Sequence, residues 1–427
     1  MRILVLGSGA REHAIVSALL GEGAGHQVVA APGNAGIAAV AETVGLDASN
    51  GDLVASYARD TAVDLVVIGP EAPLVAGVAD RVRAAGVPVF GPDRAAAALE
   101  GSKAFAKRVM DAAAVPTGRA IRAEDLDAVA DALDELGAPH VVKADGLAAG
   151  KGVLVTGDRG AARAHAEHYL QQGPVLVEEF LDGREISLFF LSDGHDVLPL
   201  SPAQDFKRVG DGDTGPNTGG MGAYSPLPWL ARGWADEDAF VTEVRDTVAL
   251  PTVRALEAEG TPFVGLLYCG LIVTEAGVRV IEFNARFGDP ETQVVLARLE
   301  TPLSGLLLAA ATGGLGGMPN PVFRDESAVI VVLASEGYPE EPITGRPIGG
   351  LDDALEVPGV TIAHAATALV EDRFVATGGR VLGVVGVGSD LAAARDAAYE
   401  AIGRIRLQGS FYRTDIAHAA IEEEAAS

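Results

Sequence analysis

The first hundred residues repeat one pattern, and this pattern limits the possible folds more than any other feature of the chain. Apolar runs end in loops rich in glycine and proline, and alanine-rich helical stretches follow. Strands separated by helices predict a parallel sheet, and ligands bind at the carboxyl ends of its strands. The runs with their loops are 2–6 with 7–13, 28–31 with 32–36, 64–68 with 69–71, and 87–90 with 91–92.

The first loop, GSGAREH at 7–13, opens a helix. A helix N-terminus behind glycines binds anions, so a nicotinamide-dependent dehydrogenase is one interpretation. Glu12 argues against it, because it stands where the dinucleotide fingerprint G-x-G-x-x-G needs its third glycine. Plain turns would explain the glycines, but they do not explain Arg11, Asn34 and Glu71 in the loops of the same sheet edge.

Composition narrows the class of partner. The net charge of −27 argues against a nucleic-acid or anionic-membrane partner. No apolar run reaches transmembrane length, and the N-terminus lacks the long apolar segment of a signal peptide. A single cysteine, Cys269, excludes an internal disulfide and fits a reducing compartment. We therefore expect a cytoplasmic protein that acts on small molecules.

The lysines are few and gathered in one region. Of 32 basic residues only five are lysines, and all five lie between residues 103 and 207. A compact ammonium group is not interchangeable with a planar guanidinium. Chance within an arginine-rich composition would scatter the lysines along the chain. Their clustering indicates that they serve a site, and phosphate groups are the expected ligand.

Three further segments carry candidate chemistry. The segment KADGLAAGKGV at 143–153 lies between two strand-like runs, so it reads as a flap over phosphates and not as a Walker A loop, which opens a helix. The run 175–181 is a strand that ends in acidic residues, a weak signal for an adenine pocket. Residues 201–225 show no helical or strand period and predict a long substrate loop.

The segment VIEFNARFGDPE at 280–291 is the strongest candidate for a metal site. In a strand, Glu282, Asn284 and Arg286 would share one face. Two oxygen donors and a guanidinium suit a Mg²⁺–phosphate site, since Mg²⁺ takes few protein ligands besides the phosphates. A solvated strand face with an edge arginine would look the same taken alone.

Eight motifs in order resemble the glycinamide ribonucleotide synthetase family of the ATP-grasp superfamily, over essentially the whole chain. They are GSGAREH at 7–13, APGNAG at 31–36, GPEAPL at 69–74, GSKAFAK at 101–107, KADGLAAGKGV at 143–153, EEFLDG at 178–183, DTGPNTGGMGAYSP at 213–226 and EFNARFGDPETQ at 282–293.

The resemblance implies a reaction in de novo purine biosynthesis. ATP, glycine and 5-phosphoribosylamine would give glycinamide ribonucleotide, ADP and phosphate through a glycyl phosphate intermediate. The metal, Mg²⁺ or Mn²⁺, would be held by Glu282 and Asn284. The residues implied to act in catalysis are Lys143, Asp213, Asn217 and Arg286. Those implied to bind ATP are Lys103, Lys143, Gly146, Gly150, Lys151, Gly152, Glu178, Glu179, Phe180, Leu181 and Glu185. Those implied to bind the other substrates are Gly9, Arg11, Glu12, Asn34, Glu71, Lys207, Asp213, Thr214, Asn217, Thr218, Gly219, Gly220, Met221 and Arg286.

The implied architecture is α/β: a Rossmann-like parallel-sheet domain over 1–102, an ATP-grasp α+β domain over 103–326 with a mobile flap subdomain near 118–190, and a small C-terminal α/β domain over 327–427. We expect a monomer. Two positions depart from the family pattern: Phe206 stands where a histidine is common, and Ala285 where a cysteine is common. Phe206 removes a possible polar contact beside Lys207, whose role is therefore less certain.

Two other interpretations stay open at this point. One is an ATP-grasp ligase or carboxylase for a different carboxylate, which the N-terminal loops and the 213–221 loop disfavour. The other is a nucleotide-binding regulatory protein without turnover, which an assay of ADP formation separates from an enzyme.

Overall fold

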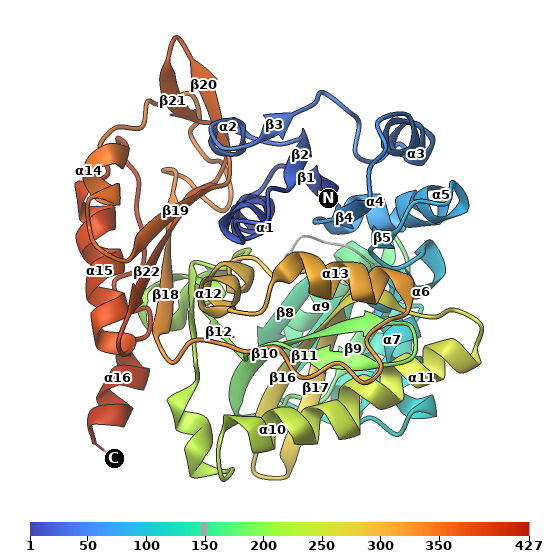
Figure 1. Ribbon diagram of the computed structural model, residues 1–427. Helices are drawn as coiled ribbons and strands as arrows, with labels where there is room; N and C mark the ends of the chain where they lie inside the picture. The colour runs from blue at the N-terminus through green and yellow to red at the C-terminus, as the bar shows by residue number, and fades with distance from the viewer. Residues whose placement is uncertain (147–151, 427) are drawn as a thin grey trace.

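The computed structural model describes residues 1–146 and 152–426. Its first sheet, blue in Figure 1, has the order β3-β2-β1-β4-β5 with every pair parallel. Register pairs Gly7 with Pro32, and Leu6 with Ile68, so the strand ends meet at one edge, as predicted. The elements are β1 (Arg2–Gly7), α1 (Ala10–Gly21), β2 (Gln27–Pro32), α2 (Ala35–Ala38), β3 (Glu42–Thr43), α3 (Gly51–Asp60), β4 (Leu65–Ile68), α4 (Glu71–Val75), α5 (Val78–Ala84), β5 (Val89–Phe90) and α6 (Arg94–Gly101).

A small antiparallel sheet, β6-β9-β7-β8, follows after α7. Ser102 is the N-cap of α7, since its hydroxyl accepts a hydrogen bond from the Phe105 N–H at 3.1 Å. The sheet and helices α8 and α9 bury a cluster of their own around Val129, Leu133 and Val142. The elements are α7 (Lys103–Ala112), β6 (Ala120–Ala123), α8 (Leu126–Leu136), β7 (His140–Ala144), β8 (Val153–Thr156), α9 (Arg159–Leu170) and β9 (Val175–Glu178).

The second antiparallel sheet of the middle of the chain has the order β11-β10-β16-β17. Helices α10 and α11 follow one another with a π-helical turn between them at Arg245–Ala249. The elements are β10 (Arg184–Asp193), β11 (Val197–Pro199), α10 (Glu237–Val244), α11 (Leu250–Ala258), β16 (Val264–Thr274), β17 (Gly277–Asn284), α12 (Glu291–Arg298) and α13 (Leu303–Thr312).

The last sheet, β12-β15-β18-β22-β19, combines two short strands from 204–225 with strands of the final hundred residues. Residues 201–225 therefore contain strands that the sequence did not reveal. These strands are only two to four residues long, too short to show an alternating apolar pattern. The elements are β12 (Gln204–Asp205), β13 (Arg208–Gly210), β14 (Thr214–Asn217), β15 (Gly222–Ser225), β18 (Ser327–Ala334), α14 (Leu351–Leu355), β19 (Val360–His364), β20 (Thr367–Val370), β21 (Arg373–Ala376), β22 (Arg380–Gly388), α15 (Leu391–Arg404) and α16 (His418–Ala425), with short 3₁₀ turns at Asp211–Asp213 and Pro228–Arg232.

Asp390 caps α15, because its Oδ1 accepts the Ala393 N–H at 2.8 Å. A carboxylate at this position also interacts favourably with the positive end of the helix dipole.

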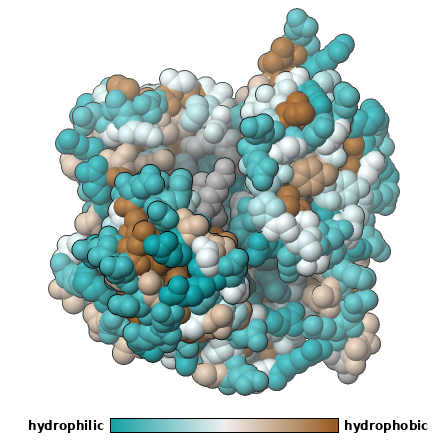
Figure 2. All heavy atoms as spheres, turned by 180° about the vertical axis from the view of Figure 1, so that it is seen from behind, coloured by the Kyte–Doolittle hydropathy of each residue, from teal (hydrophilic) through white to brown (hydrophobic). Residues whose placement is uncertain are grey.

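The orange and red C-terminal elements stand beside the blue N-terminal sheet, and both lie against the green and yellow middle of the chain (Figure 1). Seen from behind, the surface is hollowed into a groove between two masses, and the β20–β21 hairpin projects above one of them (Figure 2). Among the described residues, no helix is both long and apolar enough to cross a membrane.

Candidate active site

The strand β17 presents its polar residues on one face, as predicted. Glu282, Asn284 and Arg286 are partly exposed, whereas Phe283 and Ala285 between them are 3% and 2% exposed. This alternation is the two-residue period of a strand, and it continues through Arg286, just past the strand's last paired residue. The two candidate metal ligands and the guanidinium therefore face the same space.

Cations from three other segments surround Glu282. Lys143 on β7 donates to the carbonyl of Ile281, next to Glu282 in β17, at 3.2 Å. Burial opposes ionisation of the Glu282 carboxyl, but Lys207, Lys143 and Lys103 outweigh it and hold its pKa below the ordinary value. Glu282 is thus an anion at neutral pH, as a metal ligand must be.

Glu178, at the end of β9, forms ion pairs with two lysines. Its Oε2 lies 3.0 Å from Lys143 Nζ and 3.3 Å from Lys107 Nζ. Lys107 also donates to the Thr117 hydroxyl and the Gly118 carbonyl, each at 2.9 Å. Burial lowers the pKa of Lys107 despite the opposing charge of Glu178. Lys107 is a site residue that the motif assignments missed, although the clustering of the lysines pointed to it.

The remaining ATP-site candidates lie on the neighbouring segments. Lys103 Nζ donates to the Gly146 carbonyl at 3.4 Å, and the Gly152 carbonyl accepts the Ala144 N–H. Gly150 and Lys151, which were predicted to bind ATP, lie outside the described residues. After β9, the Glu179 carboxylate accepts the Arg119 N–H at 3.0 Å. Phe180 is 40% exposed, Leu181 is partly exposed, and Glu185 receives an ion pair from Lys207.

Arg286, just past the end of β17, connects this strand to the N-terminal domain. Its Nη2 lies 3.2 Å from Glu100 Oε1, and its Nε lies 3.6 Å from Glu71 Oε2. Glu100 Oε2 also accepts the Ala285 N–H at 2.8 Å. Burial would lower the pKa of Arg286, but Glu100 and Glu71 raise it. Arg286 Nε is buried and makes no hydrogen bond among the described residues, and its contact with Glu71 is an ion pair.

Glu12 fills the anion position at the start of α1. Its Oε2 accepts the Gly9 N–H at 2.6 Å, and its Oε1 pairs with Arg11 Nε at 2.6 Å. A Cβ on Gly7 or Gly69 would lie within 2.6 Å of the Glu12 side chain, so both loops need glycine here. The Glu12 carboxylate occupies the position where the pyrophosphate of a dinucleotide would bind. The structure therefore argues against a dinucleotide-binding site.

Arg11 and Asn34 connect the loops of the first sheet to other parts of the chain. Arg11 donates to the Phe287 carbonyl at 2.9 Å, beyond the metal strand. The Asn34 amide donates to the carbonyls of Ser8 and His364 at 2.9 and 2.7 Å, and its oxygen caps α2 by accepting the Ile37 N–H. Glu71 opens α4. The predicted substrate residues of this domain therefore meet at the carboxyl edge of the sheet.

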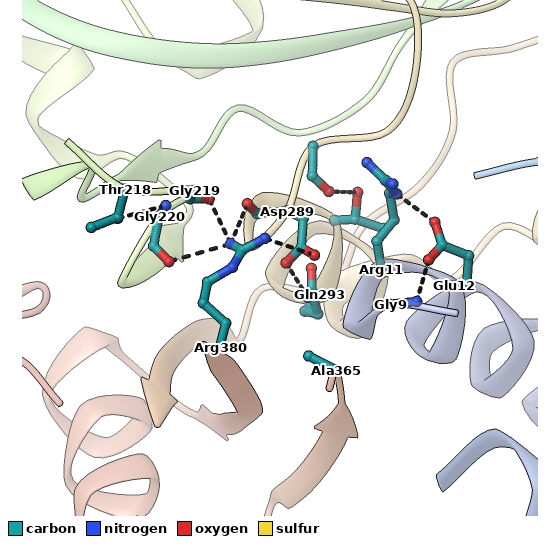
Figure 3. A network of polar contacts seen from close by, with 12 residues as sticks. Gly9, Arg11, Glu12, Thr218, Gly219, Gly220, Asp289, Gln293, Ala365 and Arg380 are labelled. Atoms are coloured by element: carbon teal, nitrogen blue, oxygen red, sulfur yellow. Dashed lines mark hydrogen bonds and ion pairs between the residues drawn. The ribbon is translucent and has the colours of Figure 1, made fainter. Parts of the chain in front are cut away.

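The predicted substrate loop folds back on itself and is held by the C-terminal elements. Thr218 donates to the Lys207 carbonyl at 2.9 Å and accepts the Gly220 N–H at 3.0 Å. Arg380, at the start of β22, donates to the carbonyls of Gly219 and Gly220 and to that of Asp289 (Figure 3).

Other members of the loop are placed as follows. Asp213 Oδ1 accepts from Arg413 at 2.7 Å, and the Thr214 hydroxyl donates to the Asp211 carbonyl. Asn217 pairs with Arg208 across the β13–β14 hairpin, and Met221 is fully buried.

A buried polar cluster lies under the Lys207 side of the site. The Tyr268 hydroxyl donates to Glu291 Oε1 at 2.6 Å, and Ser187 joins them. Burial and the charge of Glu291 raise the pKa of Asp205 to about 7, against the opposing charge of Lys207. The sequence carries no local signal for this cluster, because its members come from four separate segments.

The donor set fits a metal that brings its own ligands. Among the described residues there is no cluster of three or more His, Cys, Asp or Glu side chains that would bind a metal alone. Glu282 and Asn284 supply hard oxygen atoms, and the nearby lysines would meet phosphates. This is the arrangement in which Mg²⁺ is shared between one or two protein oxygens and a nucleotide.

An antiparallel sheet carrying this metal face, a small lysine-bearing sheet over it and a parallel-sheet domain beside it define an ATP-grasp enzyme. Residues 1–100, 101–292 and 328–419 match the N domain, the ATP-grasp (A) domain and the C domain of phosphoribosylglycinamide synthetase. The chain belongs to the phosphoribosylglycinamide synthetase family.

Related proteins match this chain over nearly its whole length. The chain is 70% identical to a phosphoribosylamine–glycine ligase of Leifsonia xyli over 98% of this chain and 99% of that protein. It is 58% identical to the same-named protein of Streptomyces coelicolor, over 98% and 99%. The crystal structure of a phosphoribosylamine–glycine ligase from Thermotoga maritima matches with a TM-score of 0.83 at 32% identity, covering 97% of this chain and all of that one.

Proposed function

We propose that the chain is an ATP-dependent ligase that joins glycine to 5-phosphoribosylamine, giving glycinamide ribonucleotide, ADP and phosphate in purine biosynthesis. The names and coverage of the relatives support this activity. The structural observation that carries it is the junction at Arg286, which links the metal face of β17 to the carboxyl edge of the N-terminal sheet. ATP chemistry and a second substrate thereby meet at one guanidinium.

The ATP side of the site follows from charge. Glu282 and Asn284 would hold Mg²⁺ or Mn²⁺, which when bound neutralises phosphate charge. Lys103 and Lys143, with Lys151 from the flap, would bind the phosphates. Phosphoryl transfer needs positioning and charge neutralisation more than covalent chemistry from the protein.

The adenosine would lie next to the end of β9. The exposed ring of Phe180 with Leu181 offers an apolar surface for the base. Glu178 and Glu179 would contribute to the pocket, and Glu185 would accept the ribose hydroxyls. Gly146, Gly150 and Gly152 would let the flap backbone approach the phosphates.

The two remaining substrates would lie between the loops. A carboxylate oxygen of glycine attacks the γ-phosphorus, ADP leaves, and glycyl phosphate forms. The amine of phosphoribosylamine then attacks the carbonyl carbon and loses a proton as phosphate leaves. Arg286 would hold the glycine carboxylate and the acyl phosphate.

Further contacts divide between the two substrates. Lys207 and the residues of the loop would orient glycine and its phosphate: Asp213, Thr214, Asn217, Thr218, Gly219, Gly220 and Met221. The residues at the N-terminal sheet edge would bind phosphoribosylamine: Gly9, Arg11, Glu12, Asn34 and Glu71.

The proposal also covers the domain boundaries, the partners, the oligomeric state and the location of the protein. The domains would span 1–102, 103–326 and 327–427, with the flap subdomain near 118–190. The acidic surface, with a net charge of −27, supports an enzyme of small molecules without a nucleic-acid partner. We propose that it acts as a monomer in the cytoplasm.

The test is release of ADP from the purified protein with Mg-ATP and glycine, with and without phosphoribosylamine formed in place from ribose 5-phosphate and ammonia. Turnover that needs both glycine and the amine supports the proposal. Turnover with a different carboxylate would keep the ATP-grasp site and replace the substrate. Tight ATP binding without turnover would indicate a regulatory protein instead.

A further inference from the structure

The tip of the substrate loop has little apolar support of its own. Residues 208–217 form a two-stranded hairpin, β13–β14, that pairs with no other strand. None of these residues is buried. An isolated two-stranded hairpin is marginally stable in water, so contacts from outside must fix its position.

Those contacts come from one short C-terminal segment, residues 413–415. Arg413 donates to Asp213 Oδ1 at 2.7 Å and to the Arg208 carbonyl at 3.1 Å. The Thr414 N–H donates to Asp211 Oδ1 at 2.8 Å. The Gly212 N–H donates to Asp415 Oδ2 at 2.8 Å. The hairpin is therefore held at Arg208 of β13 and at its turn, residues 211–213.

Burial and several contacts fix the position of the Arg413 side chain. Its side chain is 1% exposed, and Asp415 binds it in a bidentate pair, with Nε–Oδ1 at 2.8 Å and Nη2–Oδ2 at 2.7 Å. Its guanidinium lies 4.8 Å from the ring centre of Phe206. A planar guanidinium that stacks on an aromatic ring is stabilised by the contact, and the phenylalanine ring itself does not titrate. The ring of Phe206 thus supports Arg413.

The hairpin leads directly to the reaction site. Its two ends meet at Lys207 and Thr218, where the Thr218 N–H donates to the Lys207 carbonyl at 2.7 Å. Lys207 pairs with Glu185 and acts electrostatically on Glu282. On the other side of Thr218, Arg380 and the Tyr338 hydroxyl hold Gly219. A shift of the hairpin would therefore move Lys207 and the loop that follows it.

We propose that Arg413, supported by Phe206, is a positioning residue that sets the place of the 208–217 hairpin for binding of glycine and its acyl phosphate. The inference rests on the proposed function, which makes the loop a substrate loop. It gives the C-terminal domain a part in the reaction through a residue that does not touch the reacting atoms.

The experiment compares Arg413→Lys, Phe206→Leu and Arg395→Gln with the wild-type protein. Lysine keeps the charge but loses the bidentate pair and the planar stacking. Leucine keeps an apolar side chain and removes the ring face. Arg395 is the matched control, because it donates to the carbonyls of Thr414 and Ile416 and stacks on the Tyr399 ring, and among the described residues no hydrogen bond or ion pair joins it to the hairpin.

Arg413→Lys is expected to raise the KM for glycine at least about tenfold, with the KM for ATP changed less than about twofold. Phe206→Leu should shift the glycine constant in the same direction by less, and it tests the inference even where Arg413→Lys fails to fold. Arg395→Gln should leave both constants near wild type. Equal shifts for ATP and glycine, or a shift with Arg395→Gln as large as with Arg413→Lys, would overturn the assignment.

Hydrogen exchange provides a readout that does not depend on turnover. Amides of 208–217 should exchange faster in Arg413→Lys than in wild type, while those of β10 and β16 stay protected. Absence of glycine-dependent turnover in the wild-type protein would remove the proposed function, and unchanged exchange in the variant would remove the role of Arg413. The two failures are therefore distinct.

Discussion

His13 accepts a hydrogen bond at its Nδ1 from the backbone N–H of His364, at 2.8 Å and across 351 residues of chain. The contact joins α1 to the end of β19, next to the place where Asn34 meets the same segment. The two imidazole rings lie 5.6 Å apart. Two histidines that face each other in a buried interface are stable only while both are neutral.

This interface predicts a loss of stability in mild acid. Burial, with the neighbouring His364, lowers the pKa of His13 to about 4, and burial lowers the pKa of His364 to about 4. The unfolded chain binds protons at these residues below about pH 6.5, whereas the folded chain does not until about pH 4. Stability is therefore full above pH 6.5 and falls as the pH drops toward 4, by about 3 kcal/mol for each histidine.

The measurement is urea unfolding between pH 4 and 7 of wild type and of a double variant, His13→Asn with His364→Asn. Asparagine keeps an acceptor but does not titrate, so the double variant should have a flatter pH dependence in this window. His418→Asn, with a side chain 56% exposed in wild type, is the control and should keep the wild-type slope. A double variant with the wild-type slope would show that the histidine pair is not responsible.

The charge balance at Glu282 predicts opposite effects on two forms of ATP. Glu282→Gln removes an anion from the lysines around it, so metal-free ATP should bind more tightly than to wild type. Mg-ATP should bind at least about tenfold more weakly, and turnover should be lost, because a metal ligand is missing.

Isothermal titration calorimetry with ATP in EDTA and in excess Mg²⁺ separates the two effects. Glu275→Gln, in the exposed turn that joins β16 to β17, is the control and should change neither affinity. If Glu282→Gln weakened both forms alike, the loss would reflect damage to the pocket and not a missing metal ligand.

The polar face of β17 was predictable because its information is local. Glu282, Asn284 and Arg286 are two residues apart, and the strand period places them on one face without further knowledge. The parallel sheet was predictable for the same reason, since each strand, loop and helix is adjacent in sequence.

The partners of these residues were not predictable. Glu100 contacts the Ala285 N–H from 185 residues away, and Arg413 reaches Asp213 across 200 residues. No period or spacing encodes such contacts. Nearly all basic residues of the chain are arginines, so Arg380 and Arg413 cannot be told from surface arginines by sequence. Only the packing of the last sheet against the loop reveals what they hold.

Lys107 and Lys143 share Glu178 but are predicted to respond differently to substitution. Lys107→Met leaves the Thr117 hydroxyl and the Gly118 carbonyl without their partner, so stability should fall by about 1–3 kcal/mol. Its KM for ATP should change less than about threefold. Lys143→Met should raise the KM for ATP at least about tenfold, because Lys143 also lies beside Glu282 and is proposed to bind the phosphates.

Thermal unfolding and initial rates over a range of ATP concentrations measure both effects. Arg108→Met is the control, since it removes a neighbouring cation that pairs with Glu259 at the surface and stacks on the Phe105 ring. A large rise in the KM for ATP with Lys107→Met would place Lys107 among the phosphate ligands.

The two acids that bind Arg286 are predicted to separate stability from activity. The Glu100 side chain is 8% exposed and also accepts the Ala285 N–H, so Glu100→Gln leaves Arg286 buried with weaker compensation. Stability should fall by about 3 kcal/mol. The Glu71 side chain is 39% exposed, and solvent screens its pair with Arg286. Glu71→Gln should cost about 1 kcal/mol or less.

Activity should show the reverse order. Glu71 stands at the sheet edge where phosphoribosylamine is expected, so Glu71→Gln should raise the KM for this amine while the KM for ATP stays near wild type. Glu100→Gln, assayed well below its unfolding temperature, should keep both constants closer to wild type, because glutamine still accepts the Ala285 N–H. If Glu71→Gln lowered stability as much as Glu100→Gln, both acids would be structural, and Arg286 alone would remain to face the substrate.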